Sequence, residues 1–137
     1  MSNMNGSQQI FTMNTDGTDI KQLTNEGSSG DPVWSPDGSQ ISFGSNREGN
    51  GKLNIFVMNT DGSNILQLTH FQIPVESGDT NWSPDGKKII FEYDINGHLQ
   101  SDPNAFAEVW TMNANGTQQL STTQPCSSVG CAPRWRP

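Results

Sequence analysis

The feature that most constrains the fold of this chain is an internal repeat, in which two motifs alternate. The first motif occupies residues 10–24, 55–69 and 109–122, which read IFTMNTDGTDIKQLT, IFVMNTDGSNILQLT and VWTMNANGTQQLST. The second motif occupies residues 31–43 and 79–91, which read DPVWSPDGSQISF and DTNWSPDGKKIIF. The methionines of the first motif lie 45 and 54 positions apart. Repeats of about 40–50 residues that carry Trp, Gly and Asp are typical of β-propeller blades and not of helical solenoids.

The local sequence favours short strands joined by tight turns. Segments such as IFVMN and ISF are β-branched and aromatic, as strands favour. TDG and ANG tolerate the positive φ of tight hairpins, and SPDG combines Pro, Asp and Gly in the order of a turn. No stretch shows sustained helical periodicity. Each repeat is therefore predicted to form four strands: A ends at the Trp, B reads ISF or IIF, C reads IFVMN, and D lies at the QLT segment.

These motifs, in this order, resemble the TolB-like β-propeller repeat, which is also described as a WD40-like PD repeat. The resemblance rests on W-S-P-D-G, I-x-F, I-F-V-M-N-x-D-G and Q-L-T, and it covers nearly the whole chain. It implies an all-β fold of four-stranded antiparallel blades around a central channel. The combined motif is specific for the fold and not for the function, because propellers host binding proteins, enzymes and scaffolds alike.

The repeat pattern divides this single propeller segment into three blades and one further strand. Strands B, C and D of blade one are expected in residues 1–24, blade two in 31–69, blade three in 79–122, and a closing strand A in 131–137, which ends in WRP. Three blades cannot close a ring, because propellers have about four to eight. The resemblance implies six, so we expect a head-to-tail homodimer in which each chain's last strand completes the partner's first blade. The alternative is an excerpt of a longer propeller.

Charge and hydropathy limit the classes of partner. The formal net charge is −7, which disfavours nucleic-acid phosphates and anionic membrane surfaces. No apolar run reaches the roughly 18 residues that a membrane helix needs. The segment MSNMNGSQQ does not have the pattern of a signal peptide. We therefore expect no nucleic-acid partner and no membrane insertion.

Two cysteines lie close together in the segment CSSVGC. A local disulfide between Cys126 and Cys131 would imply an oxidising compartment, and two unpaired thiols are the alternative. The TolB-like resemblance itself suggests a periplasmic or extracellular bacterial location, with which a disulfide is consistent.

Two aspartates precede the repeated tryptophans by three positions. Strand A lines the channel in blades of this kind, so Asp31 and Asp79 are candidate ligands of a cation such as calcium at the channel mouth. Ala132 stands at the third equivalent position, which weakens this prediction. The alternative is that each carboxylate caps a local turn or bonds to the neighbouring blade. No other cofactor is expected.

The loops between strands B and C differ most between repeats, and loops on a rigid scaffold often carry binding residues. The candidate residues for a protein, peptide or glycan partner are Asn46, Arg47, Glu48, Asp94, Asn96, His98, Asp102, Arg134 and Arg136. The two arginines flank the last tryptophan. An ordinary solvated loop, or ion pairing for the arginines, is the alternative.

Enzymatic motifs are missing from the sequence. It contains neither G-x-S-x-G nor H-E-x-x-H, and it has two histidines. We therefore predict a non-enzymatic binding or scaffold module. One alternative is a half-propeller without a ligand, which self-assembles into a ring by strand exchange. Another is a metal-dependent enzyme, similar to propeller lyases that act on acidic sugars.

Overall fold

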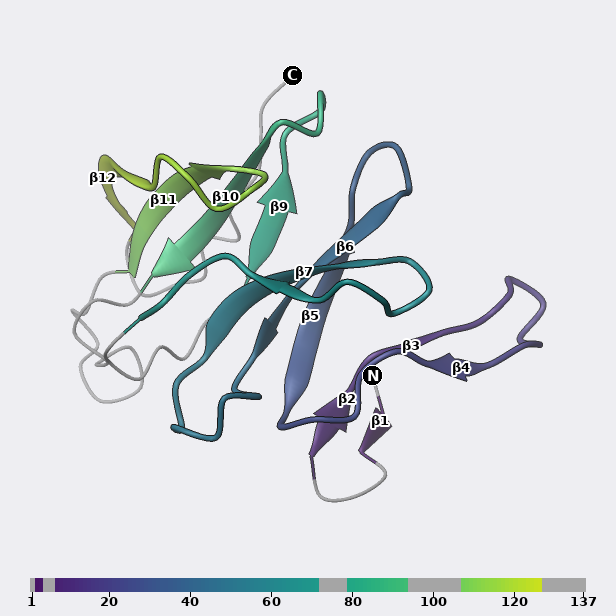
Figure 1. The fold of residues 1–137 in the computed structure, drawn as a ribbon. Coiled ribbons are helices and arrows are strands. Elements are labelled where there is room, and N and C mark those ends of the chain that lie inside the picture. The colour runs from purple at the N-terminus through teal and green to yellow at the C-terminus, as the bar shows by residue number, and fades with distance from the viewer. Residues whose placement is uncertain (1, 4–6, 72–78, 94–106, 127–137) are drawn as a thin grey trace.

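The computed structural model describes residues 2–3, 7–71, 79–93 and 107–126 (Figure 1). All paired strands in these ranges are antiparallel. The all-β class predicted from the sequence is therefore confirmed. Within these ranges no helix has the length and apolar character that crossing a membrane requires.

The second and third repeats each form a four-stranded sheet whose strands follow one another in sequence order. The sheet of repeat two consists of β5 (Ser29–Trp34), β6 (Gln40–Ser45), β7 (Asn54–Asn59) and β8 (Leu66–Gln67). The sheet of repeat three consists of β9 (Thr80–Trp82), β10 (Lys88–Tyr93), β11 (Ala107–Asn113) and β12 (Leu120–Cys126). In both sheets these strands take the order A, B, C and D.

Repeat one is smaller. It contains β1 (Ser2–Asn3), β2 (Gln8–Gln9), β3 (Phe11–Thr12) and β4 (Lys21–Gln22). Strands β2 and β3 together take the place of strand C, with β1 on one side and β4 on the other. Ser2 pairs with Gln9 in the register in which Ser45 pairs with Asn54, so β1 corresponds to the end of strand B. Among the described residues, no strand occupies the strand A position of this repeat.

The SPDG turns have the same geometry in both repeats. Ser35 Oγ donates to Asp37 Oδ1 at 2.6 Å, and Gly38 N donates to Ser35 O at 2.9 Å. The same two bonds at Ser83 measure 2.6 and 2.8 Å. Gly38 has φ 70, which glycine adopts without the steric cost that a side chain would bring. Asp37 and Asp85 are therefore turn residues, as the motif predicts.

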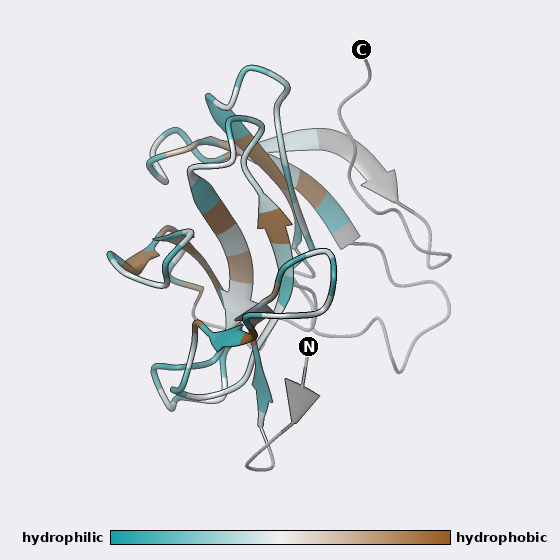
Figure 2. Ribbon diagram, turned by 90° about the vertical axis from the view of Figure 1, so that its right-hand side faces the viewer, coloured by the Kyte–Doolittle hydropathy of each residue, from teal (hydrophilic) through white to brown (hydrophobic). Residues whose placement is uncertain are grey.

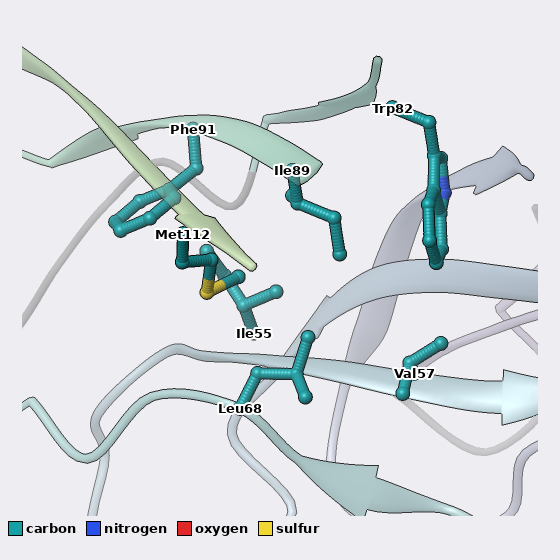
Figure 3. Packing of buried hydrophobic residues seen from close by; sticks show 7 residues of the cluster. All are labelled: Ile55, Val57, Leu68, Trp82, Ile89, Phe91 and Met112. Carbon is teal, nitrogen blue, oxygen red and sulfur yellow. The ribbon is translucent and has the colours of Figure 1, made fainter. Parts of the chain in front are cut away.

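The hydrophobic core lies between neighbouring sheets. The cluster between repeats one and two consists of Ile10, Leu23, Ile41, Phe43, Phe56 and Met58. The cluster between repeats two and three consists of Ile55, Val57, Leu68, Trp82, Ile89, Phe91 and Met112 (Figure 3). Figure 2 shows the hydrophobic positions along the strands and hydrophilic residues in the turns. Of the repeated Trp and Met residues, Trp82, Met58 and Met112 pack between sheets.

Candidate functional site

The antiparallel strand order places the connections at two opposite ends of the sheets. The turn end carries the SPDG turns and the turns between strands C and D. The rim end carries the loops between strands B and C and the connections from strand D to the next strand A. The candidate residues 31, 46–48 and 79 all belong to the rim end.

Asp31 lies in an irregular part of β5. The pairing between β5 and β6 shifts between Gly30 and Val33, which leaves Asp31 and Pro32 out of the regular register. Asp31 has φ 51, in the left-handed region that non-glycine residues seldom adopt. β-bulges of this kind bend a strand, and they are frequent beside functional sites.

Asp79 directly precedes β9, and its carboxyl group interacts with the negative charge of Asp31. Partial burial of its carboxyl group raises the pKa of Asp79, and the negative charge of Asp31 raises this pKa further. The two carboxylates are thus close enough for their charges to interact, and their role as cation ligands at a channel mouth stays a prediction. Their mutual repulsion makes a positive charge favourable at this point of the rim end.

The carboxylate pair offers few ligands for a metal. The part of the chain that the structure describes contains no group of three or more His, Cys, Asp or Glu residues that could hold a metal ion. Calcium takes about six to eight oxygen ligands, so Asp31 and Asp79 would supply only part of such a site.

The loop after β6 is fixed to the connection between β4 and β5. Asn46 Oδ1 accepts a hydrogen bond from Ser28 N at 2.7 Å, and Asn46 N donates to Ser28 O at 3.1 Å. A Cβ atom at Gly27 would lie 2.6 Å from Arg47 Cα, so only glycine allows this close approach. Gly49 N donates to Asn46 O at 3.0 Å and closes the turn.

Arg47 serves as a side-chain anchor for this loop. Its Nη2 atom lies 2.5 Å from Glu26 Oε2, and its guanidinium lies 5.7 Å from the centre of the Phe56 ring. The Arg47 side chain is only 14% exposed, whereas Glu48 is exposed to solvent. Of the three predicted binding residues in this loop, Asn46 and Arg47 therefore hold the loop in place, and partner binding by the exposed Glu48 stays a prediction.

The remaining predicted residues lie outside the described ranges. These are Asp94, Asn96, His98, Asp102, Cys131, Arg134 and Arg136. Cys126 is the last residue of β12, and its pairing with Cys131 stays a prediction.

An aromatic group at the rim end was not predicted from the sequence. The rings of Phe71 and Tyr93 stack with centroids 4.2 Å apart, and Tyr93 meets Trp110 edge to face at 5.9 Å. Trp110 Nε1 donates to Glu108 Oε2 at 3.0 Å. The signal available in the sequence was an aromatic residue at the end of strand B and another shortly after strand D.

A pocket at the turn end was also missed. It has a volume of about 320 Å³ and lies between the two SPDG turns, lined by Ser35, Pro36, Asp37, Gln40, Trp82, Pro84, Asp85 and Gly86. The motif repeats in sequence, but only the packing of adjacent sheets brings the two turns together.

Comparisons with known proteins agree with this architecture. The family model of the TolB beta propeller domain matches residues 1–134. Comparison with curated protein sequences gave no match. Among solved structures, a putative TolB from Agrobacterium tumefaciens is 27% identical, with a TM-score of 0.69. TolB from Acinetobacter baumannii is 22% identical, with a TM-score of 0.68. An oligogalacturonate lyase in complex with manganese is 20% identical, with a TM-score of 0.59.

The chain spans less than half of each of these structures. The alignments cover 82%, 84% and 83% of this chain, but 40%, 26% and 28% of the respective neighbours. The two neighbours below 25% identity establish similarity of fold alone.

Proposed function

Because this chain belongs to the TolB β-propeller family, we propose that it is a non-enzymatic module that binds a protein partner through its rim end. The observation that carries the proposal is the anchored loop at residues 45–49. A loop that is already fixed in the free protein loses little conformational entropy on binding. Its exposed Glu48 is therefore presented to a partner at low entropic cost.

The charge of the rim end suggests the chemistry of the partner. Glu48, Asp31 and Asp79 all contribute negative charge there, and the whole chain carries −7. Complementary charge speeds association and selects partners. We expect a protein or peptide segment that presents Lys or Arg. A glycan is a less suitable partner for this acidic surface, although the aromatic group of Phe71, Tyr93 and Trp110 offers stacking surfaces.

The test uses the full chain as bait in a bacterial periplasmic extract. Bound proteins are identified by mass spectrometry, and the purified candidate is then titrated in a calorimeter. Glu48→Gln removes one carboxylate at the rim end, and Asp19→Asn removes one exposed carboxylate at the turn end as the matched control. We expect Glu48→Gln to weaken binding about 3- to 10-fold, and Asp19→Asn to leave it unchanged. Equal effects of the two variants would reject the rim end as the binding surface.

A second candidate function is self-assembly into a six-bladed ring as a homodimer. The missing strand A of repeat one in the described ranges favours it, because repeat one then has an unpaired side. The two functions are compatible, since a closed ring would still present its rim end.

Metal-dependent lyase activity is a weaker alternative. It is favoured by the similarity to oligogalacturonate lyase, but the identity of 20% supports the shared fold and not the shared chemistry. Manganese-dependent cleavage of oligogalacturonate by the purified chain would support this lyase alternative.

Three finer features remain proposals alongside the main function. The family resemblance suggests a periplasmic location, and a Cys126–Cys131 disulfide would be consistent with it. Calcium at Asp31 and Asp79 would relieve their repulsion. Loss of a calcium-dependent rise in Tm in Asp79→Asn would support this last proposal, and wild-type protein without such a rise would reject it.

A further inference from the structure

Equivalent positions of the first motif differ sharply in burial between repeats. Met13 is 68% exposed, whereas Met58 and Met112 are 0% exposed. Ile20 is also exposed, whereas its counterpart Ile65 packs against the core cluster between repeats one and two. The motif is nearly the same in sequence, so the difference arises from what lies beside it. In repeats two and three, the sheet of the preceding repeat covers these positions.

The glycine of the C–D turn shows the same difference. A Cβ atom at Gly62 would lie 3.1 Å from Leu23 O, and one at Gly116 would lie 2.9 Å from Leu68 O. A Cβ atom at Gly17 would meet nothing within 4 Å. The turns of repeats two and three therefore rest against strand D of the preceding repeat, and the turn of repeat one faces open space.

Trp34 is a further uncovered position. Trp82 is 5% exposed, and its Nε1 donates to Val33 O of the preceding strand A at 3.2 Å. Trp34 occupies the same place in repeat two and is 51% exposed. It lies where strand A of repeat one would cover it. We call Met13, Gly17 and Ile20 together the uncovered face.

Repeat three has incompletely buried positions on the side that a following repeat would cover. Ile10 and Ile55 are buried because the next repeat covers them, but their counterpart Val109 is only half-buried. Thr122 is likewise half-buried at the position of the buried residues Leu23 and Leu68. The chain thus carries both halves of one inter-repeat contact, one on repeat one and the other on repeat three.

We infer that the uncovered face is an interface with a second copy of this chain, whose repeat three packs against Met13 and Ile20. This inference rests on the proposed self-assembly and identifies the surfaces that meet. The contact is head to tail, so two such contacts related by a two-fold axis close a ring. One chain spans 40% of the putative TolB structure, so two copies span about four fifths of it.

The inference is tested by the solution mass of the full chain and of two charge variants. The variant Met13→Glu places a carboxylate in the proposed contact. Leu66→Glu is the matched control, because Leu66 is 52% exposed and its counterpart Leu120 is also exposed, so neither position belongs to an inter-repeat contact. Light scattering during gel filtration measures the mass over a dilution series, and far-UV circular dichroism checks that both variants fold.

We expect wild type and Leu66→Glu at twice 15.0 kDa. Met13→Glu should raise the dimer dissociation constant about 100-fold or more, since a buried unpaired charge is costly at an interface. A dimer that Met13→Glu does not weaken would overturn the inference and leave the self-assembly proposal standing. A monomeric wild type would overturn both and leave protein binding at the rim end unaffected. Equal dissociation by Leu66→Glu would also overturn the inference, because the effect would not be specific to this face.

Discussion

Alanine substitution in the C–D turns can separate contact between repeats from strain within the turn. Gly17 and Gly116 hold equivalent positions in the first and third repeats, and both have φ 83. A Cβ atom at Gly17 meets no atom within 4 Å, whereas one at Gly116 would lie 2.9 Å from Leu68 O and 3.1 Å from Leu68 Cα. The two substitutions therefore share their backbone strain and differ only in the contact with the preceding sheet.

The expected magnitudes follow from these two terms. Positive φ costs an alanine about 1–2 kcal/mol in either turn. The forced contact at Gly116 adds about 1–3 kcal/mol, as overpacking does in a close-packed core. We therefore expect Gly17→Ala to lower the free energy of unfolding by about 1–2 kcal/mol and Gly116→Ala to lower it by about 2–5 kcal/mol.

Urea denaturation followed by tryptophan fluorescence measures both losses. The comparison is made in the Met13→Glu background, in which the dimer contact is weakened and Gly17 stays uncovered. The m-value of each variant must match the background, so that a change in midpoint reports stability. Equal losses at the two glycines would refute the argument that the preceding sheet covers the turn of repeat three and not that of repeat one.

Three further predictions concern tryptophan packing, pH dependence and backbone strain. Trp82→Phe removes a buried hydrogen bond and core volume, so it should lower the free energy of unfolding by about 2–3 kcal/mol. Trp34→Phe in the Met13→Glu background should lower it by less than about 0.5 kcal/mol, because Trp34 is exposed. Urea denaturation measures both changes. The pKa of Asp79 is raised in the folded state, so Asp79→Asn should raise Tm at pH 7, with the gain vanishing as the pH falls below about 4. The pKa of Asp85 is lowered by a serine hydroxyl, so Asp85→Asn should lower Tm at pH 7, and this loss should shrink as the pH falls through the lowered pKa; Tm shifts of the same sign for the two variants at pH 7 would contradict these assignments. Gln118 has φ 53, so Gln118→Gly should raise the free energy of unfolding by about 0.5–1 kcal/mol, and a loss of stability would contradict the strain.

Local patterns in the sequence predicted the strands and turns because their causes are local. The SPDG turn closes through bonds between residues two or three positions apart, such as Ser35 to Asp37. The same motif could not predict that Met13 is exposed while Met58 is buried, because burial depends on the neighbouring sheet. Repetition in sequence thus predicts the repeating unit, and each unit's environment requires the structure.

The rim end was predicted less completely for the same reason. The repeat puts Asp31 and Asp79 at equivalent positions, and their charges interact in the structure, but their role as cation ligands stays a prediction. Arg47 was taken as a binding residue because it lies in a variable polar loop, and nothing near it in sequence shows that Glu26 anchors it. Glu26 is 21 residues away, and a contact at that separation leaves no local pattern.

The carboxylates of this chain divide into two groups by what they do for the fold. At the turn end, a hydroxyl group lowers the pKa of each repeated turn aspartate, namely Asp16, Asp37, Asp61 and Asp85. These carboxylates favour the folded state at neutral pH. At the rim end, burial and the charge of Asp31 raise the pKa of Asp79, so the ionised Asp79 opposes folding. A charge that lowers the stability of the fold is a better candidate for function than one that stabilises a turn. Functional sites often contain interactions that are unfavourable for stability. This asymmetry, together with the anchored loop at the same end of the sheets, supports the proposal that a partner binds at the rim end and not at the turn end.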